Sequence, residues 1–261
     1  MTKLIYILVI IMAFILTSCI PEDDNGEPDP DEVVTFADAG LEQCVRERIN
    51  KSEGEIYYKD VKYIYSLSSC GGKNIESLNG IEILPNLMSL SLGNNKIKDV
   101  TPLGKCTKLV ELELDNNQIE DASPLSSLVN LTRLNIVYNK IQQIDFAGGL
   151  NLLTNLDISD NPVSDVGPIA KLVNLEELGI SNANIDTIEQ IEKLSKLRVL
   201  WAQNNYIDSI YVVKYFLELK VLNITNNCIS DFSPIDYLRQ NGNLTSVRGD
   251  TYEDQDYEKC E

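Results

Sequence analysis

An apolar pattern that recurs every 22 residues is the feature that most limits how this chain can fold. The spacing is L-x-x-L-x-L-x-x-N-x-I-x-D-h-x-P-h-x-x-h-x-x, in which h is apolar. Seven units follow one another without an insertion or deletion, and they begin at Leu87, Leu109, Leu131, Leu153, Leu175, Leu197 and Leu219. A fixed period of about 20 to 50 residues is typical of solenoids, in which each unit is one coil of a stack. We therefore expect most of the chain to form one elongated stack of coils.

Each unit reads as one coil with a short strand. Leu90 and Leu92 alternate with Ser91, so a strand here buries two leucines and exposes the residue between them. Asn95 then turns the chain, and residues 101–103 carry it back along the outer side. One coil cannot bury its own leucines, so its stability comes from its neighbours. Parallel strands lie ~4.8 Å apart, which predicts a sheet roughly 30 Å long over seven coils.

The asparagines of the repeat form a column along the stack. Its members are Asn95, Asn117, Asn139, Asn161, Asn205 and Asn227. A side-chain amide at a buried turn can satisfy backbone groups that the turn leaves unpaired. Ala183 stands where the fifth coil should carry an asparagine, and loss of one such bond typically costs about 1 kcal/mol. We expect this gap to be a weak point of the stack.

The complete pattern resembles the internalin-like branch of the leucine-rich-repeat proteins. Residues 95–103 (NKIKDVTPL) and 161–169 (NPVSDVGPI) carry the match most clearly, and the resemblance covers roughly Phe36 to Leu238. It implies a leucine-rich-repeat solenoid of the α/β class, a right-handed superhelix with a curved parallel sheet on the concave face. A helical N-terminal cap and turns or short helical segments on the convex face are also implied. Residues 143–146 and 187–190 lack both the Asp and the Pro, so we expect those outer segments to be more irregular or more helical.

The N-terminus reads as an export signal. Lys3 precedes an apolar run over residues 4–16, which is too short to span a bilayer as a stable helix. The segment Leu16-Thr17-Ser18-Cys19 resembles a bacterial lipobox, which implies cleavage before Cys19 and lipidation of that residue. The alternative is an ordinary secretory signal with an incidental cysteine. The predicted plan is a lipoprotein signal peptide (1–18), lipidated Cys and acidic disordered tether (19–35), N-terminal cap (36–64), leucine-rich repeats (65–240, one irregular and seven regular coils) and C-terminal cap or tail (241–261).

The segment after Cys19 is strongly acidic. Residues 20–32 contain seven acidic residues and three prolines, so they cannot form a core and should stay extended. An acidic cluster after a lipidated cysteine also resembles the surface-export signal of some Gram-negative lipoproteins. The resemblance implies a lipid-anchored protein of the bacterial outer membrane, exposed at the cell surface. The alternative is a spacer that holds the domain off the membrane.

Five cysteines remain after Cys19. Cys44 lies on a predicted capping helix and Cys70 on an inward strand position, so a disulfide between them would pin the cap onto the stack. Cys228 in the last turn and Cys260 in the tail would form a second bridge. Cys106 occupies a core position and should be free and buried. Free thiols throughout are the alternative, because sequence alone does not fix connectivity.

Charge and composition exclude several functions. The chain contains no histidine, which removes catalytic triads and histidine metal sites. Removal of residues 1–18 would leave 21 basic and 40 acidic residues, a net charge of −19. Such a field repels nucleic acid and anionic lipid surfaces. We expect no enzyme activity, no cofactor and no metal, a membrane association through the lipid anchor only, and a monomer.

The exposed strand positions are the predicted binding surface. An acidic band is expected from Glu111, Glu113, Asp115, Asp157 and Glu177, with Arg133 among them. An exposed apolar patch is expected from Val199, Trp201 and Val221, and Tyr138 and Tyr206 at the rim could extend it. Tryptophan is over-represented among binding hot spots, so Trp201 is the predicted anchor. The alternative is ordinary solvated strand surface, with an aromatic that covers its neighbours.

The expected role is binding of a protein partner through the concave face, in adhesion or in interaction with a host or neighbouring cell. A glycan-binding component of the cell envelope, with Trp201 stacked on a sugar, is the alternative from another class. A structural envelope protein is the third. Arg248-Gly249-Asp250 resembles the integrin-recognition motif, but a chain of this length carries that triplet by chance in roughly one case in twenty, so we interpret it as a coincidence.

Overall fold

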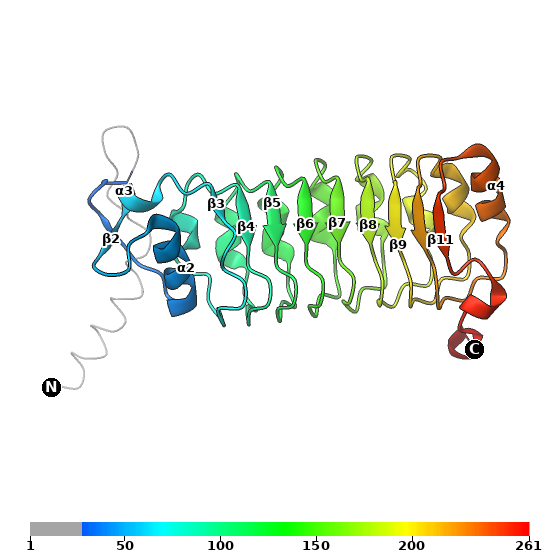
Figure 1. Ribbon diagram of the computed structural model, residues 1–261, viewed down its shortest axis with the longest axis horizontal. Helices are drawn as coiled ribbons and strands as arrows, with labels where there is room; N and C mark the ends of the chain where they lie inside the picture. The colour runs from blue at the N-terminus through cyan, green and yellow to red at the C-terminus, as the bar shows by residue number, and fades with distance from the viewer. Residues whose placement is uncertain (1–27, 261) are drawn as a thin grey trace.

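The computed structural model describes residues 28–260, which form one elongated stack with strands along one face and short helical turns along the other (Figure 1). The strands make one nine-stranded parallel sheet in sequence order. They are β3 (Ser66–Leu67), β4 (Ser89–Ser91), β5 (Glu111–Glu113), β6 (Arg133–Asn135), β7 (Asn155–Asp157), β8 (Glu177–Gly179), β9 (Val199–Trp201), β10 (Val221–Asn223) and β11 (Ser246–Arg248). The predicted leucine-rich-repeat solenoid is confirmed.

The outer side of the stack consists of 3-10 turns. They are η1 (Ile81–Ile83), η2 (Thr101–Lys105), η3 (Ser123–Ser127), η4 (Asp145–Gly149), η5 (Gly167–Lys171), η6 (Glu189–Ile191) and η7 (Tyr211–Tyr215). Proline at the start of η2, η3 and η5 suits such a turn, because its fixed φ is preorganised and its missing N–H is not needed there. Although η4 lacks proline, it has the same five-residue length as these turns, whereas η6 has three residues. The irregularity expected of both segments is therefore seen in one.

The core lies between the sheet and the outer turns. Leu90, Leu112 and Leu134 are register partners on successive strands, and each is at most 1% exposed. Full burial of a leucine side chain contributes about 1.5–3 kcal/mol, and each coil supplies several such residues to its neighbours. Stability is therefore distributed along the stack.

The asparagine column is buried and fully bonded, and we call it the buried ladder. Its residues are Asn95, Asn117, Asn139, Asn161, Asn205 and Asn227. Asn139 is representative: its Nδ2 donates to the carbonyls of Ile136 and Leu114 at 3.0 Å each. Its Oδ1 accepts from the N–H of Ile119 in the preceding coil at 3.0 Å. Each amide thus joins two coils.

The gap at Ala183 changes the local hydrogen bonding. In an intact coil, the N–H equivalent to that of Val163 bonds the asparagine side chain of the next coil. Here the Val163 N–H instead donates to the carbonyl of Asn161 at 2.8 Å. Ala183 itself is 7% exposed. The preceding coil has adjusted to the missing amide rather than leaving its donor unpaired.

A small cap closes the N-terminal end. It contains β1 (Val33–Val34), which pairs antiparallel with β2 (Ile56–Tyr57), together with α2 (Ala39–Ile49) and α3 (Tyr58–Val61). The Asp38 side chain caps α2 by accepting from the first backbone N–H groups of the helix. The cap begins before the expected boundary at residue 36, because the strand pairing includes residues 33 and 34.

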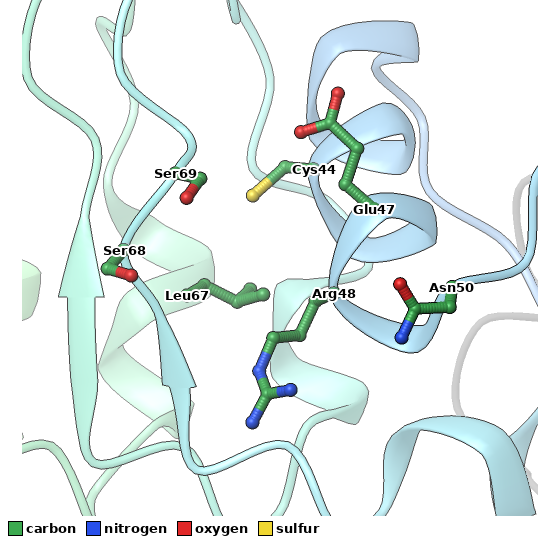
Figure 2. A pocket seen from close by; sticks show the side chains of 7 residues that line it. All are labelled: Cys44, Glu47, Arg48, Asn50, Leu67, Ser68 and Ser69. Atoms are coloured by element: carbon green, nitrogen blue, oxygen red, sulfur yellow. The ribbon is translucent and has the colours of Figure 1, made fainter.

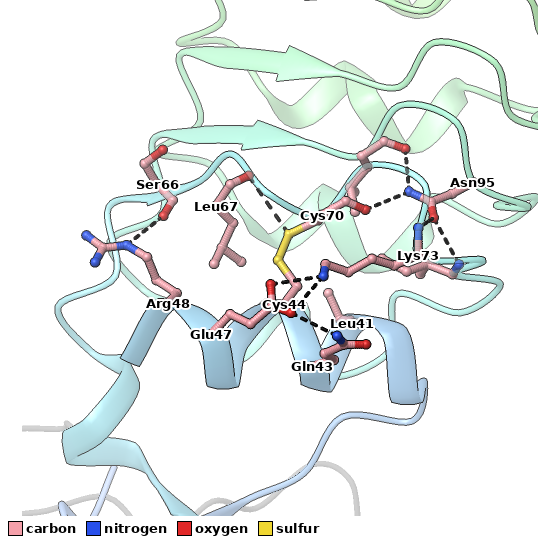
Figure 3. Close-up of a disulfide and its surroundings, with 12 residues drawn as sticks. Leu41, Gln43, Cys44, Glu47, Arg48, Ser66, Leu67, Cys70, Lys73 and Asn95 are labelled. Carbon is pink, nitrogen blue, oxygen red and sulfur yellow. Dashed lines mark hydrogen bonds and ion pairs between the residues drawn. A yellow bond between two sulfur atoms is a disulfide. The ribbon is translucent and has the colours of Figure 1, made fainter. Parts of the chain in front are cut away.

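A disulfide between Cys44 and Cys70 joins α2 to the first coil (Figure 3). Beside it, Lys73 forms an ion pair with Glu47, and the Arg48 Nε donates to the carbonyl of Ser66. The Cys70 carbonyl accepts from Asn95 at 2.9 Å, as the Leu92 carbonyl accepts from Asn117 at 3.1 Å. Cys70 therefore occupies the position of Leu92, as the register predicted.

The C-terminal end differs from the expected boundary at residue 240. Helix α4 (Ser233–Asn241) replaces the 3-10 turn of the last coil, so Val221 and its partner Ser246 lie 25 positions apart instead of 22. The ninth strand, β11, therefore falls in the segment expected to be C-terminal cap or tail. Two 3-10 turns follow, η8 (Tyr252–Asp254) and η9 (Tyr257–Cys260), and a disulfide joins Cys228 to Cys260.

Cys106 is a buried free thiol, and burial raises its pKa to about 12. The predicted signal peptide, Cys19 and most of the tether lie outside the described residues. Over residues 28–260, no helix is both long and apolar enough to cross a membrane.

Candidate functional site

The outward positions of the strands, and the second residue after each strand, form one surface, which we call the sheet face. It consists of three columns parallel to the stack axis. The first is Ser89, Glu111, Arg133, Asn155, Glu177, Val199 and Val221; the second is Ser91, Glu113, Asn135, Asp157, Gly179, Trp201 and Asn223; the third is Gly93, Asp115, Val137, Ser159, Ser181, Gln203 and Thr225. The nine predicted ligand-binding residues belong to this surface, except Tyr138, which lies at its rim.

The predicted acidic band of Glu111, Glu113, Asp115, Asp157 and Glu177 carries uncompensated charge. Hydroxyls of Ser89 and Ser91 donate to Glu111 and Glu113 at 3.4 and 2.7 Å. None of the five carboxylates belongs to an ion pair in the described part of the chain, and neither does Arg133. Acidic groups without bound cations attract a basic partner surface.

Two of these carboxylates lie over glycines of the neighbouring coil. A Cβ built on Gly93 would lie 2.4 Å from the Asp115 Oδ1, and one built on Gly179 would lie 2.2 Å from the Asp157 Oδ1. Asp157 also accepts from the Ser159 N–H at 3.0 Å. Burial raises the pKa of Asp157, although the hydrogen bonds from Ser159 oppose this effect. The ionised form of Asp157 is therefore poorly solvated in the free protein.

The predicted apolar patch is less exposed than its register suggested. Val199, Trp201 and Val221 are half-buried, because side chains on adjacent strands cover each other. Tyr138 and Tyr206 are more open, with 60% and 43% of their surface exposed. The Lys259 ammonium lies 5.3 Å from the centroid of the Tyr206 ring, so Tyr206 contacts the C-terminal tail. Tyr138 is therefore the more accessible aromatic of the rim.

A second column, which sequence reasoning missed, lies beside the buried ladder. Its residues all have left-handed backbone conformations, and we call it the rim ladder: Asn94, Asn116, Tyr138, Asp160, Asn182, Asn204 and Asn226. Hydrogen bonds of 2.6–2.8 Å between side-chain amides join Asn94 to Asn116, Asn182 to Asn204, and Asn204 to Asn226. Consecutive Asn-Asn pairs in the sequence were the signal that could have revealed it. Asparagine tolerates this conformation, whereas most other residues are strained in it.

Tyr138 interrupts the rim ladder at a cost. Its φ of 54° lies in the left-handed region, which is unusual for an aromatic residue. Strain of this kind persists at functional sites more often than elsewhere. Tyr138 neighbours Val137 on the sheet face, and its side chain is 60% exposed. Strain and exposure together make Tyr138 a stronger contact candidate than the register alone indicated.

The third column contains two polar atoms without partners. The Ser181 N–H donates to the Ser159 Oγ at 3.0 Å. However, the Ser181 Oγ and the Gln203 Oε1 are both buried and have no hydrogen-bond partner among residues 28–260. Ser181 is only 2% exposed. A buried polar atom left unpaired typically costs about 1–3 kcal/mol, so this part of the sheet face is unsatisfied in the free protein.

A hollow of about 280 Å³ lies away from the sheet face, between α2 and β3 (Figure 2). Glu47 and Arg48 line it, together with Ser68, Ser69 and Asn50. Both charged groups are already used, because Glu47 pairs with Lys73 and Arg48 donates to Ser66. This hollow therefore belongs to the attachment of the cap.

Two further sequence features can be placed. In the tripeptide Arg248-Gly249-Asp250, Gly249 is buried with φ of 84°, and Asp250 pairs with Arg239. The tripeptide thus packs against the last coil instead of standing at the tip of a free loop. Over residues 28–260, no group of three or more side chains is arranged to hold a metal ion.

Comparisons with known proteins agree with this geometry. The model of the family "Leucine Rich repeats (2 copies)" matches residues 85–127, 107–152 and 151–195. A comparison with curated proteins finds no match. The chain is therefore a leucine-rich-repeat protein by sequence as well as by fold.

Solved structures identify the branch. An internalin C2 from Listeria monocytogenes is 31% identical, with a TM-score of 0.78, and the match covers 81% of this chain and 93% of that one. An internalin (inlF) from the same organism is 25% identical, with a TM-score of 0.58 and coverage of 82% and 75%. A leucine-rich-repeat protein of Leptospira interrogans is also 25% identical, with a TM-score of 0.62 and coverage of 71% and 50%. The chain belongs to the internalin-like leucine-rich-repeat proteins.

Membership in this family has a general functional meaning. Leucine-rich-repeat proteins of the internalin type typically mediate protein–protein interaction. Their fold is generally a non-enzymatic scaffold for such interactions.

Proposed function

We propose that this protein is a surface-anchored lipoprotein whose sheet face binds a protein partner in adhesion or in contact with a host or neighbouring cell. The observation that carries the proposal is the composition of that face. It combines five carboxylates without ion pairs, the half-buried Trp201 and the strained, exposed Tyr138. A desolvated aromatic anchor surrounded by charged groups is a common arrangement in protein recognition.

The predicted ligand-binding residues have distinct roles in this proposal. Trp201, with Val199 and Val221 paired in the adjacent column, supplies the apolar contact at one end of the face. Tyr138 supplies a second contact nearer its middle. The acidic side chains, with Arg133 among them, orient the partner and select for positive charge; they are Glu111, Glu113, Asp157 and Glu177.

A binding screen tests the proposal directly. Residues 20–261 are screened against extracellular proteins and against glycans, with wild type beside Trp201→Ala and Tyr138→Asn. Tyr215→Ala is the matched control, because Tyr215 is 46% exposed on the opposite, outer side. We expect a protein partner whose affinity falls at least tenfold in the two sheet-face variants and stays unchanged in the control. Loss in the control alone would place binding on the outer side.

Ionic strength separates protein binding from the glycan alternative. Binding steered by the acidic face should weaken as salt rises, because salt screens exposed charges over about 8–10 Å at ordinary ionic strength. Stacking of a neutral sugar on Trp201 should hardly respond. If the screen finds a glycan whose binding requires Trp201 and does not change with salt, the ligand is a glycan and the proposed protein partner is wrong.

The anchor is tested on whole cells. Incorporation of labelled fatty acid should depend on Cys19 and disappear in Cys19→Ala. Protease treatment of intact cells should release the folded domain if it is exposed at the cell surface. If the protein carries the fatty-acid label but is protected from the protease, the lipid anchor is supported and the surface location is contradicted.

A further inference from the structure

The centre of the sheet face contains an incomplete polar site. Asp157, Gly179 and Trp201 are register partners on consecutive strands, so they lie in one column. Ser181 and Gln203 lie on the same side, two residues after the ends of β8 and β9. Gly179 has no side chain, and the Asp157 carboxylate lies over it, within 2.2 Å of where a Cβ would stand. The site thus has a carboxylate at one side, an indole at the other and two oxygens at its edge.

The oxygens of this site lack donors. No cation pairs with Asp157 in the described part of the chain, and its carboxylate accepts hydrogen bonds from Ser159, through the backbone N–H and the side chain. The Gln203 Oε1 is buried and unpaired, and so is the Ser181 Oγ. Burial raises the pKa of Asp157, as expected for a carboxylate that lacks a counterion. What the site lacks is a group with several N–H donors and a positive charge.

We propose that this site, which we call the Asp157–Trp201 site, accepts a guanidinium or ammonium side chain of the protein partner. Asp157 supplies the charge, Gln203 turns its oxygen toward the incoming donors, and the Trp201 ring attracts the cation through its face. Because Gly179 has no side chain, the Asp157 carboxylate can lie over it, on the side of Trp201. This inference rests on the proposed function, and it names the chemistry that the partner must present.

Asp115 provides an internal comparison. It also lies over a glycine, Gly93, on the same face, and its Oδ1 is 2.4 Å from the corresponding Cβ position. Asp115 has no aromatic neighbour in the sheet-face columns of β4 and β6, and none of the unpaired buried atoms lies beside it. An Asp115→Asn variant removes the same charge from the same face without touching the proposed site.

The experiment uses the single tryptophan of the chain as a reporter. N-acetyl-L-argininamide is titrated into residues 20–261 while the Trp201 indole N–H signal is followed by NMR. The uncharged isostere N-acetyl-L-citrullinamide is the ligand control. We expect a saturable shift with the arginine compound alone. Asp157→Asn should weaken it at least about tenfold, as loss of a charge-assisted hydrogen bond does, whereas Asp115→Asn should change it less than about twofold.

A second variant tests geometry without changing charge. Gly179→Ala places a methyl group where the Asp157 carboxylate lies, so the carboxylate must move and binding should again weaken about tenfold. Its folding is checked by the dispersion of the NMR spectrum. Equal binding of citrullinamide, equal loss in Asp115→Asn, or the absence of a saturable shift would overturn the inference. The proposed function is judged separately: a protein partner that requires Trp201 but is not displaced by argininamide would sustain it and refute the cation site.

Discussion

The buried ladder and the rim ladder run side by side through the same turns, yet they have different roles. Each Asn of the buried ladder joins its own coil to the preceding one through several backbone hydrogen bonds. Each Asn of the rim ladder instead bonds mainly its neighbours' amides at the surface. The first ladder is interrupted by a small apolar residue, Ala183, and the second by Tyr138 and Asp160.

The two kinds of interruption show where this fold can vary. Within the buried ladder, the substitution is accommodated by a changed backbone hydrogen bond at Val163. Within the rim ladder, the substitution introduces a strained aromatic side chain that is largely exposed. Strain retained at the surface, where an asparagine would be easier, favours a role in binding. The four predictions that follow test this contrast.

The largest effect is expected from removing one amide of each ladder. Asn139→Ala leaves buried backbone groups of two coils unpaired and should destabilise the protein by about 2–4 kcal/mol. For a chain of this size, that corresponds to a melting temperature lower by roughly 5–15 °C. Asn116→Ala, in the exposed ladder, should cost only about 1 kcal/mol, because alanine adopts the left-handed backbone of this position less readily than asparagine but no buried group is left unpaired. Thermal unfolding followed by circular dichroism compares the two, and equal losses would erase the distinction between the ladders.

Tyr138→Asn should stabilise the protein while weakening partner binding. Asparagine adopts the left-handed conformation more easily, so the variant should gain about 1 kcal/mol and melt about 2–4 °C higher. Tyr206→Asn is the control, since Tyr206 is not among the positive-φ residues and no gain is expected there. A lower melting temperature for Tyr138→Asn would mean that the ring stabilises the fold, and the argument from strain would fail.

Ala183→Asn should raise stability, but less than the loss in Asn139→Ala. The new amide would restore the missing member of the buried ladder and contribute up to about 1 kcal/mol. The gain is limited because the Val163 N–H already has a partner in the Asn161 carbonyl. Denaturant unfolding measures the difference. An unchanged or lower stability would show that the turn at Ala183 no longer fits an asparagine.

The smallest effect is a pH dependence centred on Asp157. Its pKa is raised in the folded protein, so the folded state binds the proton more tightly than the unfolded state, and protonation stabilises the fold as pH falls. Asp157→Asn should therefore melt above wild type at neutral pH. That advantage should disappear at about pH 3, below the ordinary carboxyl pKa. An advantage that is independent of pH would assign the effect to packing instead of charge.

The sequence predicted the repeat architecture because strict spacing leaves few alternatives. Seven units in phase determine which leucines are inward, where each turn falls and which asparagines align, and the structure agrees at each of these positions. The last coil was missed for the same reason. Helix α4 lengthens the spacing from 22 to 25 residues, so β11 lies out of phase with the pattern that revealed the others.

The binding face could be outlined but not detailed from the sequence. Register identified which residues face outward, but it could not show that neighbours half-bury Trp201. Nor could it reveal the carboxylate over Gly179, the unpaired oxygens of Ser181 and Gln203, or the left-handed backbone of Tyr138. These features depend on contacts between coils and on backbone angles, and a linear pattern records neither.

The constant sequence separation between residues bonded in the buried ladder has an evolutionary consequence. Apart from a bond that the Asn95 Oδ1 accepts from the Lys73 N–H in the irregular first coil, the inter-coil side-chain bonds of the buried ladder join residues 20 or 25 positions apart, and the same offsets recur from coil to coil. A gene segment that encodes 22 residues could therefore be duplicated or lost in frame, and the coils on either side would meet with the same bonds. Lineages could lengthen or shorten the binding surface one coil at a time and reshuffle its exposed residues, while the disulfide-tied caps at both ends stay unchanged.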